Sequence, residues 1–566
     1  MSGSNSVLPG DANTYSLTPK IAIIAVISLY FALTCFRLGW TDLGSDEGRF
    51  GLSAMNILTD HHQIAIVSED PLGLPGTKPY MYPLTIAAVF ALLGESEFTL
   101  RIVNVLSLLI AAFGFYALSM ILIKNRTLSL LVFGLFLLNP ATITYARVAL
   151  PEPLVAAFGS MGLVAMAKFR DELRIRWAVL GGVAFACGFL SKLWLVSPFV
   201  LAAVLLVLER WYRRRERKMI VGLTVAGISF LIVASSHLLL VLWMDPSNLP
   251  HWEDIYFVFS MKSRAGGLGY DPDMWYRPWW FYLATLFRGS FFGLPLVFLG
   301  ARSFAKHRDW PVMLVLFALF IPVVMFSCMR VKQATYVYPA IFAIILLMGQ
   351  GFLYLHSSKA WKELAVASMA SLGLAVFFWR GVGALQTQEF LPVALLFVLY
   401  IALASVWVRF RRVAESILCL ALVSTLFFVG ILAVRKNLEH RTYFREIGAY
   451  FIDRLQSKKP QDIAFVSPEF PAMEFYTFRS GQYWKTFYFK ENSEDFVEDL
   501  RNGNRVFYLV DPSGELYGGK VEPDKLIALN DYAVEVTSDF QRSIGHAIKL
   551  RIFVPRDSMR VSDPHR

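Results

Sequence analysis

Two adjacent acids, Asp46 and Glu47, stand directly after the first long apolar segment, in the stretch LGSDEGRF. A carboxylate held beside a hydroxyl can take its proton and so activate a poor nucleophile. The pair also suits a helix start, with Ser45 as N-cap and acids in the first turn favouring the positive end of the helix dipole. These residue types therefore predict either a general base or a helix N-terminus.

A second acid and three basic residues could belong to the same catalytic site as such a general base. Glu152 lies between two prolines in ARVALPEP, where an acid and a proline would equally suit a first helical turn. Lys78, Arg264 and Lys332 are candidates to stabilise a departing phosphate, since cations must wait where negative charge develops. Each has a simpler interpretation, because a lysine can snorkel from a span end and Arg264 can be a solvated loop charge.

The surrounding chain is that of a membrane protein. Of 566 residues, 56% are hydrophobic and only 17% are charged, more apolar surface than a soluble domain could bury. Apolar runs of about the 17 to 25 residues that cross a bilayer recur from Ile21 to Val434. Thirteen spans are expected, near residues 21–38, 101–122, 127–145, 153–168, 177–190, 193–208, 219–243, 279–300, 311–328, 336–355, 364–382, 391–408 and 413–433.

Basic residues set the expected orientation. They cluster in alternate connectors, such as 210–218, which the positive-inside rule places in the cytoplasm. The opposite connectors, including a long loop over 41–100, then face outward. If the short apolar run from Pro79 to Gly94 crossed the membrane, the basic connectors that follow it would lie on the wrong side. It is therefore expected to be an interfacial helix within that loop.

The chain thus divides into a membrane domain over 1–435 and a polar tail over 436–566. Short apolar stretches in the tail, IAFVS and RVFYLV, predict strands of a small extracytoplasmic α/β domain. The net charge of +11 comes largely from the cytoplasmic connectors, so anionic membrane lipids, and not nucleic acid, are the expected partners of these charges.

Five motifs in this order resemble the GT-C group of polyprenyl-phosphate-sugar-dependent glycosyltransferases. The motifs are SDEGRF, KPYMYPL, ARVALPEP, YRPWWFYL and MRVKQATYVYP, all on the expected outer face. The group includes bacterial relatives of protein O-mannosyltransferases and the aminoarabinose transferase that modifies lipid A. This chain departs from it at Tyr80, where the group commonly has proline, and at Glu152, where it often has aspartate.

The resemblance implies a polytopic α-helical fold of GT-C type and an enzyme of the cytoplasmic (inner) membrane with its site facing outward. Asp46 and Glu152 would be its catalytic acids. Asp46 is the preferred base, because successive helical side chains diverge by about 100° and the resemblance favours the first acid of the pair. The expected substrate-binding residues are Glu47, Lys78, Tyr80, Arg264, Lys332 and Tyr336.

The implied partners are a polyprenyl-phosphate-linked sugar and a lipid, glycan or protein acceptor. Asp46 and Glu152 could also hold a divalent cation through carboxylate oxygens, although nothing in the sequence compels a metal. The principal alternative is a transporter or flippase of a lipid-linked substrate, which would place ionisable residues near the bilayer midplane. A nonenzymatic scaffold that presents the tail would not need the arrangement of acids and lysine.

Overall fold

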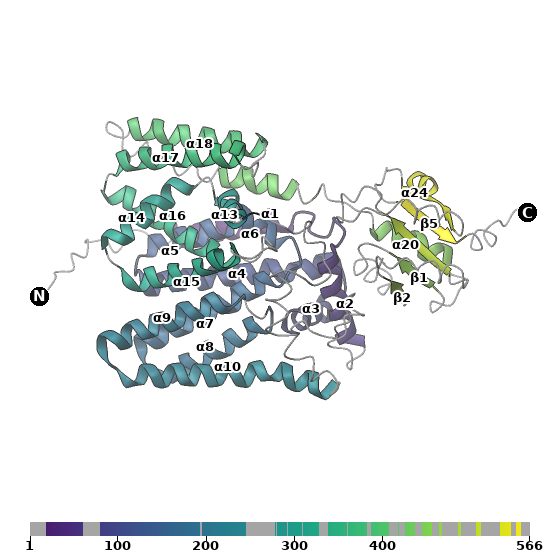
Figure 1. Ribbon diagram of the computed structural model, residues 1–566, viewed down its shortest axis with the longest axis horizontal. Coiled ribbons are helices and arrows are strands. Elements are labelled where there is room, and N and C mark those ends of the chain that lie inside the picture. Colours follow the sequence, from purple (N-terminus) through teal and green to yellow (C-terminus); the bar gives the residue numbers. More distant parts are fainter. Residues whose placement is uncertain are drawn as a thin grey trace, which may run out of the picture.

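A computed structural model provides the structure of the chain. It describes residues 18–59, 80–192, 195–244, 278, 280–290, 293–307, 309–327, 338–358, 360–381, 387–406, 417, 425–435, 438, 444–455, 463–466, 485–487, 505–510, 533–544 and 551–555. Figure 1 shows long helices packed side by side, with a smaller part that contains the strands at one end.

The long helices overlap the predicted spans, most of them one to one. They are α1 (Thr18–Cys35), α4 (Glu97–Leu122), α5 (Arg126–Leu137), α6 (Pro140–Ala146), α7 (Glu152–Glu172), α8 (Ile175–Phe189), α9 (Ser197–Arg214), α10 (Arg217–Met244), α13 (Phe281–Ser290), α14 (Leu294–His307), α15 (Trp310–Ser327), α16 (Tyr338–Ser358), α17 (Trp361–Val376), which continues as a π-helix over Phe377–Gly381, and α18 (Thr387–Val406). The single span predicted over 279–300 corresponds to two helices, α13 and the first half of α14. The last predicted span is helical over Thr425–Arg435.

Several of these helices have the length and apolarity of a bilayer span. Within the described ranges five helices qualify, and six do if the bent pair α5 and α6 forms one span. The axes of that pair differ by 53° because a new helix starts at Pro140, where the Asn139 side chain accepts a hydrogen bond from the Ala141 amide. The chain is a polytopic helical membrane protein.

Close backbone approach holds part of this body together. An added Cβ at Gly300 of α14 would lie 2.0 Å from the Leu347 carbonyl oxygen of α16, and one at Gly351 of α16 would lie 1.9 Å from that of Leu296. Small residues that let helix backbones touch are a common basis of helix association in membranes. The two glycines therefore set the spacing between α14 and α16.

A helix, α3 (Met81–Leu93), is present where an interfacial helix was predicted, and it packs on α2 (Ser45–Thr59) at one end of the helical body (Figure 1). At 13 residues α3 is too short to cross a bilayer. Phe50 of α2 meets Tyr82 of α3 edge-on with ring centroids 5.0 Å apart. Buried Ile86 and Phe90 of α3 extend the same apolar contact.

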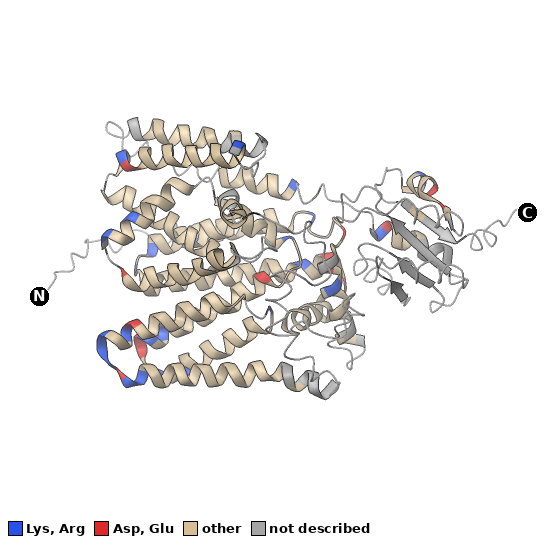
Figure 2. Ribbon diagram, in the orientation of Figure 1, with Lys and Arg blue, Asp and Glu red and all other residues tan. Residues whose placement is uncertain are grey.

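Charged side chains mark the other end of the body. Figure 2 shows Lys and Arg gathered at the end that lies away from α2 and α3. Arg213 and Arg214 in the last turn of α9 and Arg215 directly after it are exposed at this end. This asymmetry between the two ends is the one that the positive-inside rule uses.

The tail contains α20 (Phe444–Leu455), α24 (Thr537–Ile544) and a five-stranded mixed sheet. Its strands are β1 (Ile463–Val466), β2 (Lys485–Phe487), β3 (Arg505–Val510), β4 (Ala533–Glu535) and β5 (Arg551–Pro555), in the order β2-β1-β3-β5-β4. β1 is parallel to β2 and β3, whereas β5 is antiparallel to β3 and β4. The strands expected in IAFVS and RVFYLV are confirmed as β1 and β3.

Candidate functional site

Glu47, in the first turn of α2, is a buried junction between two motifs. Its Oε1 accepts hydrogen bonds from Arg101 Nε and from the Ala149 amide, both at 2.8 Å. Its Oε2 accepts from the Gly44 amide and from Arg101 Nη2, both at 2.9 Å. Four donors from the protein fill a carboxylate that is only 5% exposed. Through the Ala149 amide, Glu47 links the SDEGRF motif to the ARVALPEP motif. The predicted role of Glu47 in substrate binding stays a prediction.

Arg101, one turn into α4, organises the chain that leads into α2. Its Nη1 donates to the carbonyl oxygens of Leu38 and Thr41 at 2.9 Å, and its Nη2 donates to that of Asp42 at 2.8 Å. A planar guanidinium can serve such divergent acceptors at once, which an ammonium cannot do. Arg101 therefore fixes both the exit from α1 and, through Glu47, the start of α2.

Arg147 of the ARVALPEP motif caps the end of α1. Its Nη1 donates to the carbonyl oxygens of Thr34 and Phe36, both at 2.8 Å. These oxygens lie at the negative end of the helix dipole, where a cation is stabilising. Burial, with a smaller contribution from the Arg101 charge, lowers the pKa of Arg147 to about 10. Arg147 is thus still charged at neutral pH.

Asn104 joins α3 and α4 to the turn that precedes Glu152. Its Oδ1 accepts a hydrogen bond from the Tyr82 hydroxyl at 3.0 Å, and its Nδ2 donates to the Leu150 carbonyl oxygen at 2.9 Å. Burial raises the pKa of Tyr82, and the negative charges of Glu47 and Glu152 add to the effect. The Tyr82 phenol is therefore a neutral hydrogen-bond donor.

Glu152, which is fully buried, forms an ion pair with the partly exposed Lys192. The distance from Lys192 Nζ to Glu152 Oε1 is 2.5 Å, and the two side chains are 24% and 0% exposed, respectively. Glu152 Oε2 is buried and has no hydrogen-bond partner among the described residues. Such an oxygen retains the capacity to accept a bond from a bound hydroxyl or amine.

Lys192 was missed by the sequence reasoning, although a signal for it was present. The predicted topology places the short connector between spans 177–190 and 193–208 on the outer face, where a lysine runs against the positive-inside bias. The Met81 amide donates to the Leu190 carbonyl oxygen at 3.1 Å, which attaches this connector to the start of α3. The KPYMYPL motif thereby reaches the neighbourhood of Lys192 and Glu152.

Tyrosines line the surroundings of Glu152. The rings of Tyr145 in α6 and Tyr338 in α16 meet edge-on with centroids 4.7 Å apart. Tyr145 immediately precedes ARVALPEP, the motif that contains Glu152. Tyr338 belongs to the MRVKQATYVYP motif, so a fourth of the predicted motifs contributes to the same region.

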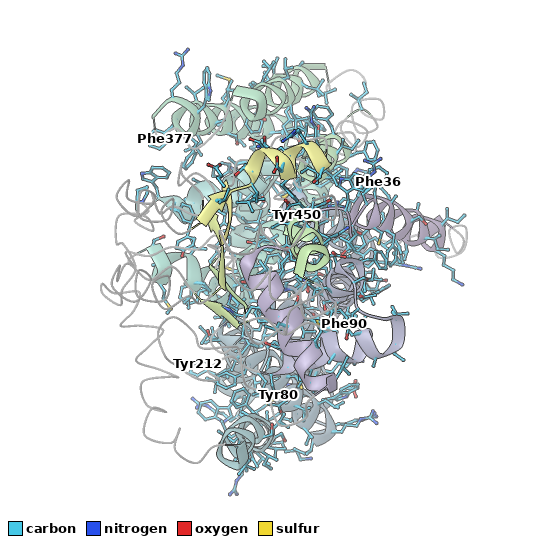
Figure 3. The ribbon with its side chains drawn as sticks, turned by 90° about the vertical axis from the view of Figure 1, so that its right-hand side faces the viewer. Phe36, Tyr80, Phe90, Tyr212, Phe377 and Tyr450 are labelled. Atoms are coloured by element: carbon cyan, nitrogen blue, oxygen red, sulfur yellow. The ribbon has the colours of Figure 1, made fainter. Side chains whose placement is uncertain are left out.

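Tyr80 lies at the start of α3, and its hydroxyl is 2.6 Å from the Ser236 hydroxyl of α10. Figure 3 views this end of the body and labels Tyr80. Lys78, Arg264, Lys332 and Tyr336 fall outside the described residues, as does the side chain of Asp46, whose backbone is in α2. Their predicted roles stay predictions.

A metal site is not assembled by the part of the chain that the structure describes. No three His, Cys, Asp or Glu residues gather there into a possible metal site. Glu152, one of the two predicted ligands, has the Lys192 ammonium as its cationic partner. Its unpartnered Oε2 leaves room for a second charge or a hydrogen-bond donor, so the cation stays a prediction.

The chain is similar in fold to two solved structures of ArnT. Crystal structures of ArnT from Cupriavidus metallidurans, one bound to undecaprenyl phosphate and one in the apo state, superpose with TM-scores of 0.65 and 0.63. The first is 16% identical in sequence, and the superposition covers 94% of this chain and 97% of that one.

The sequence comparisons agree with this fold. The family model described as dolichyl-phosphate-mannose-protein mannosyltransferase matches residues 62–245. A protein of Shewanella sediminis named undecaprenyl phosphate-alpha-4-amino-4-deoxy-L-arabinose arabinosyl transferase is 27% identical over 66% of this chain and 68% of its own. A protein of the same name from Pectobacterium carotovorum is 25% identical over 53% of this chain and 54% of its own. The chain thus spans about half the length of some curated relatives that it matches, and its resemblance to aminoarabinose transferases is confirmed.

Proposed function

We propose that the chain is an integral membrane glycosyltransferase that moves a sugar from a polyprenyl phosphate to a hydroxyl or phosphate of a lipid, glycan or protein acceptor. The main observation behind this proposal is the convergence of four motifs, distant in sequence, around the ion pair of Glu152 and Lys192. The relatives named for undecaprenyl-phosphate-linked aminoarabinose support this donor class. Those names do not favour a transporter or flippase.

In the proposed reaction the acceptor oxygen attacks the anomeric carbon of the donor sugar. The new bond joins that carbon to the acceptor, while the bond between the carbon and the phosphate oxygen breaks. The electron pair of the broken bond leaves with the polyprenyl phosphate. When the acceptor is a hydroxyl, its proton passes to the Asp46 carboxylate as general base.

The cations of the site stabilise the departing phosphate. Lys192 is the candidate whose position the described residues support, because it lies beside α3 with its side chain 24% exposed. Lys78, Arg264 and Lys332 complete the proposed set. A preorganised cation stabilises developing negative charge without reorganisation at the moment of reaction.

The remaining site residues bind and orient the substrate. Tyr80 and Tyr336 are the proposed substrate contacts, and Glu152 is proposed to accept a hydrogen bond from the sugar or the acceptor through Oε2. A divalent cation held by Asp46 and Glu152 is the alternative arrangement. Loss of turnover with EDTA and its recovery with a divalent cation would establish the metal, and unchanged turnover would reject it.

The proposed topology has thirteen spans in the cytoplasmic (inner) membrane, with α2, α3 and the tail outside. The membrane domain covers 1–435 and the extracytoplasmic α/β domain covers 436–566. The basic end of the body in Figure 2 supports a cytoplasmic location for that end. A C-terminal reporter that is active only outside the cytoplasm should give a signal, and a cytoplasmic signal would reject this topology.

The function itself is tested with purified protein in detergent. The donors are undecaprenyl phosphate carrying 4-amino-4-deoxy-L-arabinose and, in parallel, other polyprenyl-phosphate sugars, with membrane lipid extract as acceptor. We expect release of undecaprenyl phosphate together with a glycosylated product that is detected by mass. Donor movement between leaflets of reconstituted vesicles without any product would instead establish the flippase alternative.

A further inference from the structure

The tail contacts the helical body through Arg445, in the first turn of α20. Its Nη2 donates a hydrogen bond to the Gly39 carbonyl oxygen at 3.0 Å, across 406 positions of sequence. The same atom lies 2.7 Å from Glu97 Oε1, and the Glu97 side chain is only 6% exposed. One tail residue therefore holds two separate segments of the membrane body.

Both of these segments belong to the scaffold of the proposed site. Gly39 lies in the turn between α1 and α2 whose neighbouring carbonyls, from Leu38 and Thr41, accept hydrogen bonds from Arg101. Glu97 is the first residue of α4, one helical turn before Arg101. Arg445 thus holds from the tail the same turn that Arg101 holds from within the body.

The turn has little freedom to move without α4. An added Cβ at Gly39 would lie 3.2 Å from the Phe98 amide nitrogen, so the two segments are in close contact. Apolar packing accompanies the polar contacts. One buried cluster contains tail residues together with residues of α2 and α3, namely Ile447, Val536, Phe540 and Ile552 with Phe50, Ala54, Met55, Tyr82 and Phe90.

We propose that Arg445 and Glu97 form a positioning pair that couples the tail to the turn between α1 and α2, and so to Asp46 in the first turn of α2. The pair does not touch substrate in this proposal. It holds α2 in register, so the tail is part of the scaffold of the catalytic site. The inference rests on the proposed function for its effect on turnover, but the contact itself is independent of that function.

Hydrogen exchange in the full-length protein tests the contact without any activity. Arg445→Gln should raise exchange several-fold in peptides that cover 37–50 and leave the interior of α8 unchanged. Arg542→Gln is the matched control, because Arg542 is an exposed tail arginine that pairs with Asp539 on its own helix. If Arg445→Gln does not accumulate, Glu97→Gln removes the other half of the pair. Unchanged exchange in the variant that is measured would overturn the proposal.

Kinetics test the positioning role. We expect Arg445→Gln to lower kcat by about tenfold or more, because small misplacement of a catalytic group is costly, while the donor KM changes by less than about twofold. Arg445→Lys should restore part of the loss. The double variant with Glu97→Gln should be little worse than the more impaired single variant, since both remove one contact. Unchanged kcat, or a raised donor KM with normal kcat, would overturn the proposal that Arg445 positions the catalytic site. A wild-type protein without transferase activity would reject the proposed function and leave the exchange result standing.

Discussion

The two ends of the helical body use the same charged residue types in opposite ways. At the end with α2 and α3, Arg101 is 2% exposed and binds the carbonyls of a separate segment. At the basic end, Arg213 is 57% exposed and pairs with Glu209 one turn away on its own helix. A charge withdrawn from water must be fully partnered, so the first kind builds tertiary structure, whereas the second is solvated and mainly marks membrane orientation.

The largest effect is expected from Asp46→Asn, which removes the proposed base. The amide keeps the shape and the capping ability of the residue, so the fold should survive. Loss of base catalysis lowers the rate by roughly 10² to 10⁴-fold, or about 3 to 5 kcal/mol of barrier. Turnover at equal membrane abundance measures it. An active Asp46→Asn protein would show that this acid only favours the start of α2.

Arg101→Met should be next, and its effect should appear in stability. It leaves the Glu47 carboxylate buried without its cation, a change that costs about 3 to 5 kcal/mol. Thermal unfolding in detergent measures the loss, with Arg213→Met as the matched control at the basic end. Combining Arg101→Met with Glu47→Gln should recover part of the stability. Equal melting temperatures for the two arginine variants would show that Arg101 stabilises the protein no more than the exposed Arg213 does.

Lys192→Gln should lower kcat/KM for the donor more than it lowers the stability of the protein. A charge-assisted contact with a phosphate oxygen contributes about 1.5 to 3 kcal/mol, so we expect a loss of roughly ten- to a hundredfold in kcat/KM for the donor. Lys168→Gln is the control, since Lys168 of α7 lies over the Trp177 ring at 4.4 Å, away from Glu152. Donor use equal to that of the control would limit Lys192 to pairing with Glu152.

The smallest effect is expected from Arg213→Gln. An exposed pair of this kind contributes about 0.3 to 0.5 kcal/mol, and salt screens it. Unfolding temperature and turnover should both match the parent protein. A loss comparable to that of Arg101→Met would mean that the basic connectors carry tertiary structure as well as orientation.

Much of the helical body could be predicted from the sequence, because apolar runs of bilayer length report helices directly. The helix predicted between Pro79 and Gly94 is present as α3, and the two strands predicted in the tail are present as β1 and β3. The break between α5 and α6 was not predicted. An uninterrupted apolar run conceals the change of direction that starts at Pro140.

The candidate site divides in the same way. The order of the motifs indicated that the chain resembles GT-C transferases, and the side of the membrane expected for each motif grouped Asp46 with Glu152. From the sequence, Glu47 was predicted to bind substrate, but its partners could not be predicted: its carboxylate accepts hydrogen bonds from Arg101 and from two backbone amides. Which of two adjacent carboxylates accepts hydrogen bonds from within the protein depends on partners that are distant in sequence.

The sequence alone determined the apolar spans, the asymmetry of basic residues and the set of outer-face motifs, because each depends on local composition or on position relative to a membrane. Only the tertiary structure decided that Glu152 pairs with Lys192, that Arg101 and Arg147 bind the end of α1 and the turn after it, and that Arg445 brings the tail onto that turn. The physical reason is that a buried charge must find donors or acceptors wherever the packed chain supplies them.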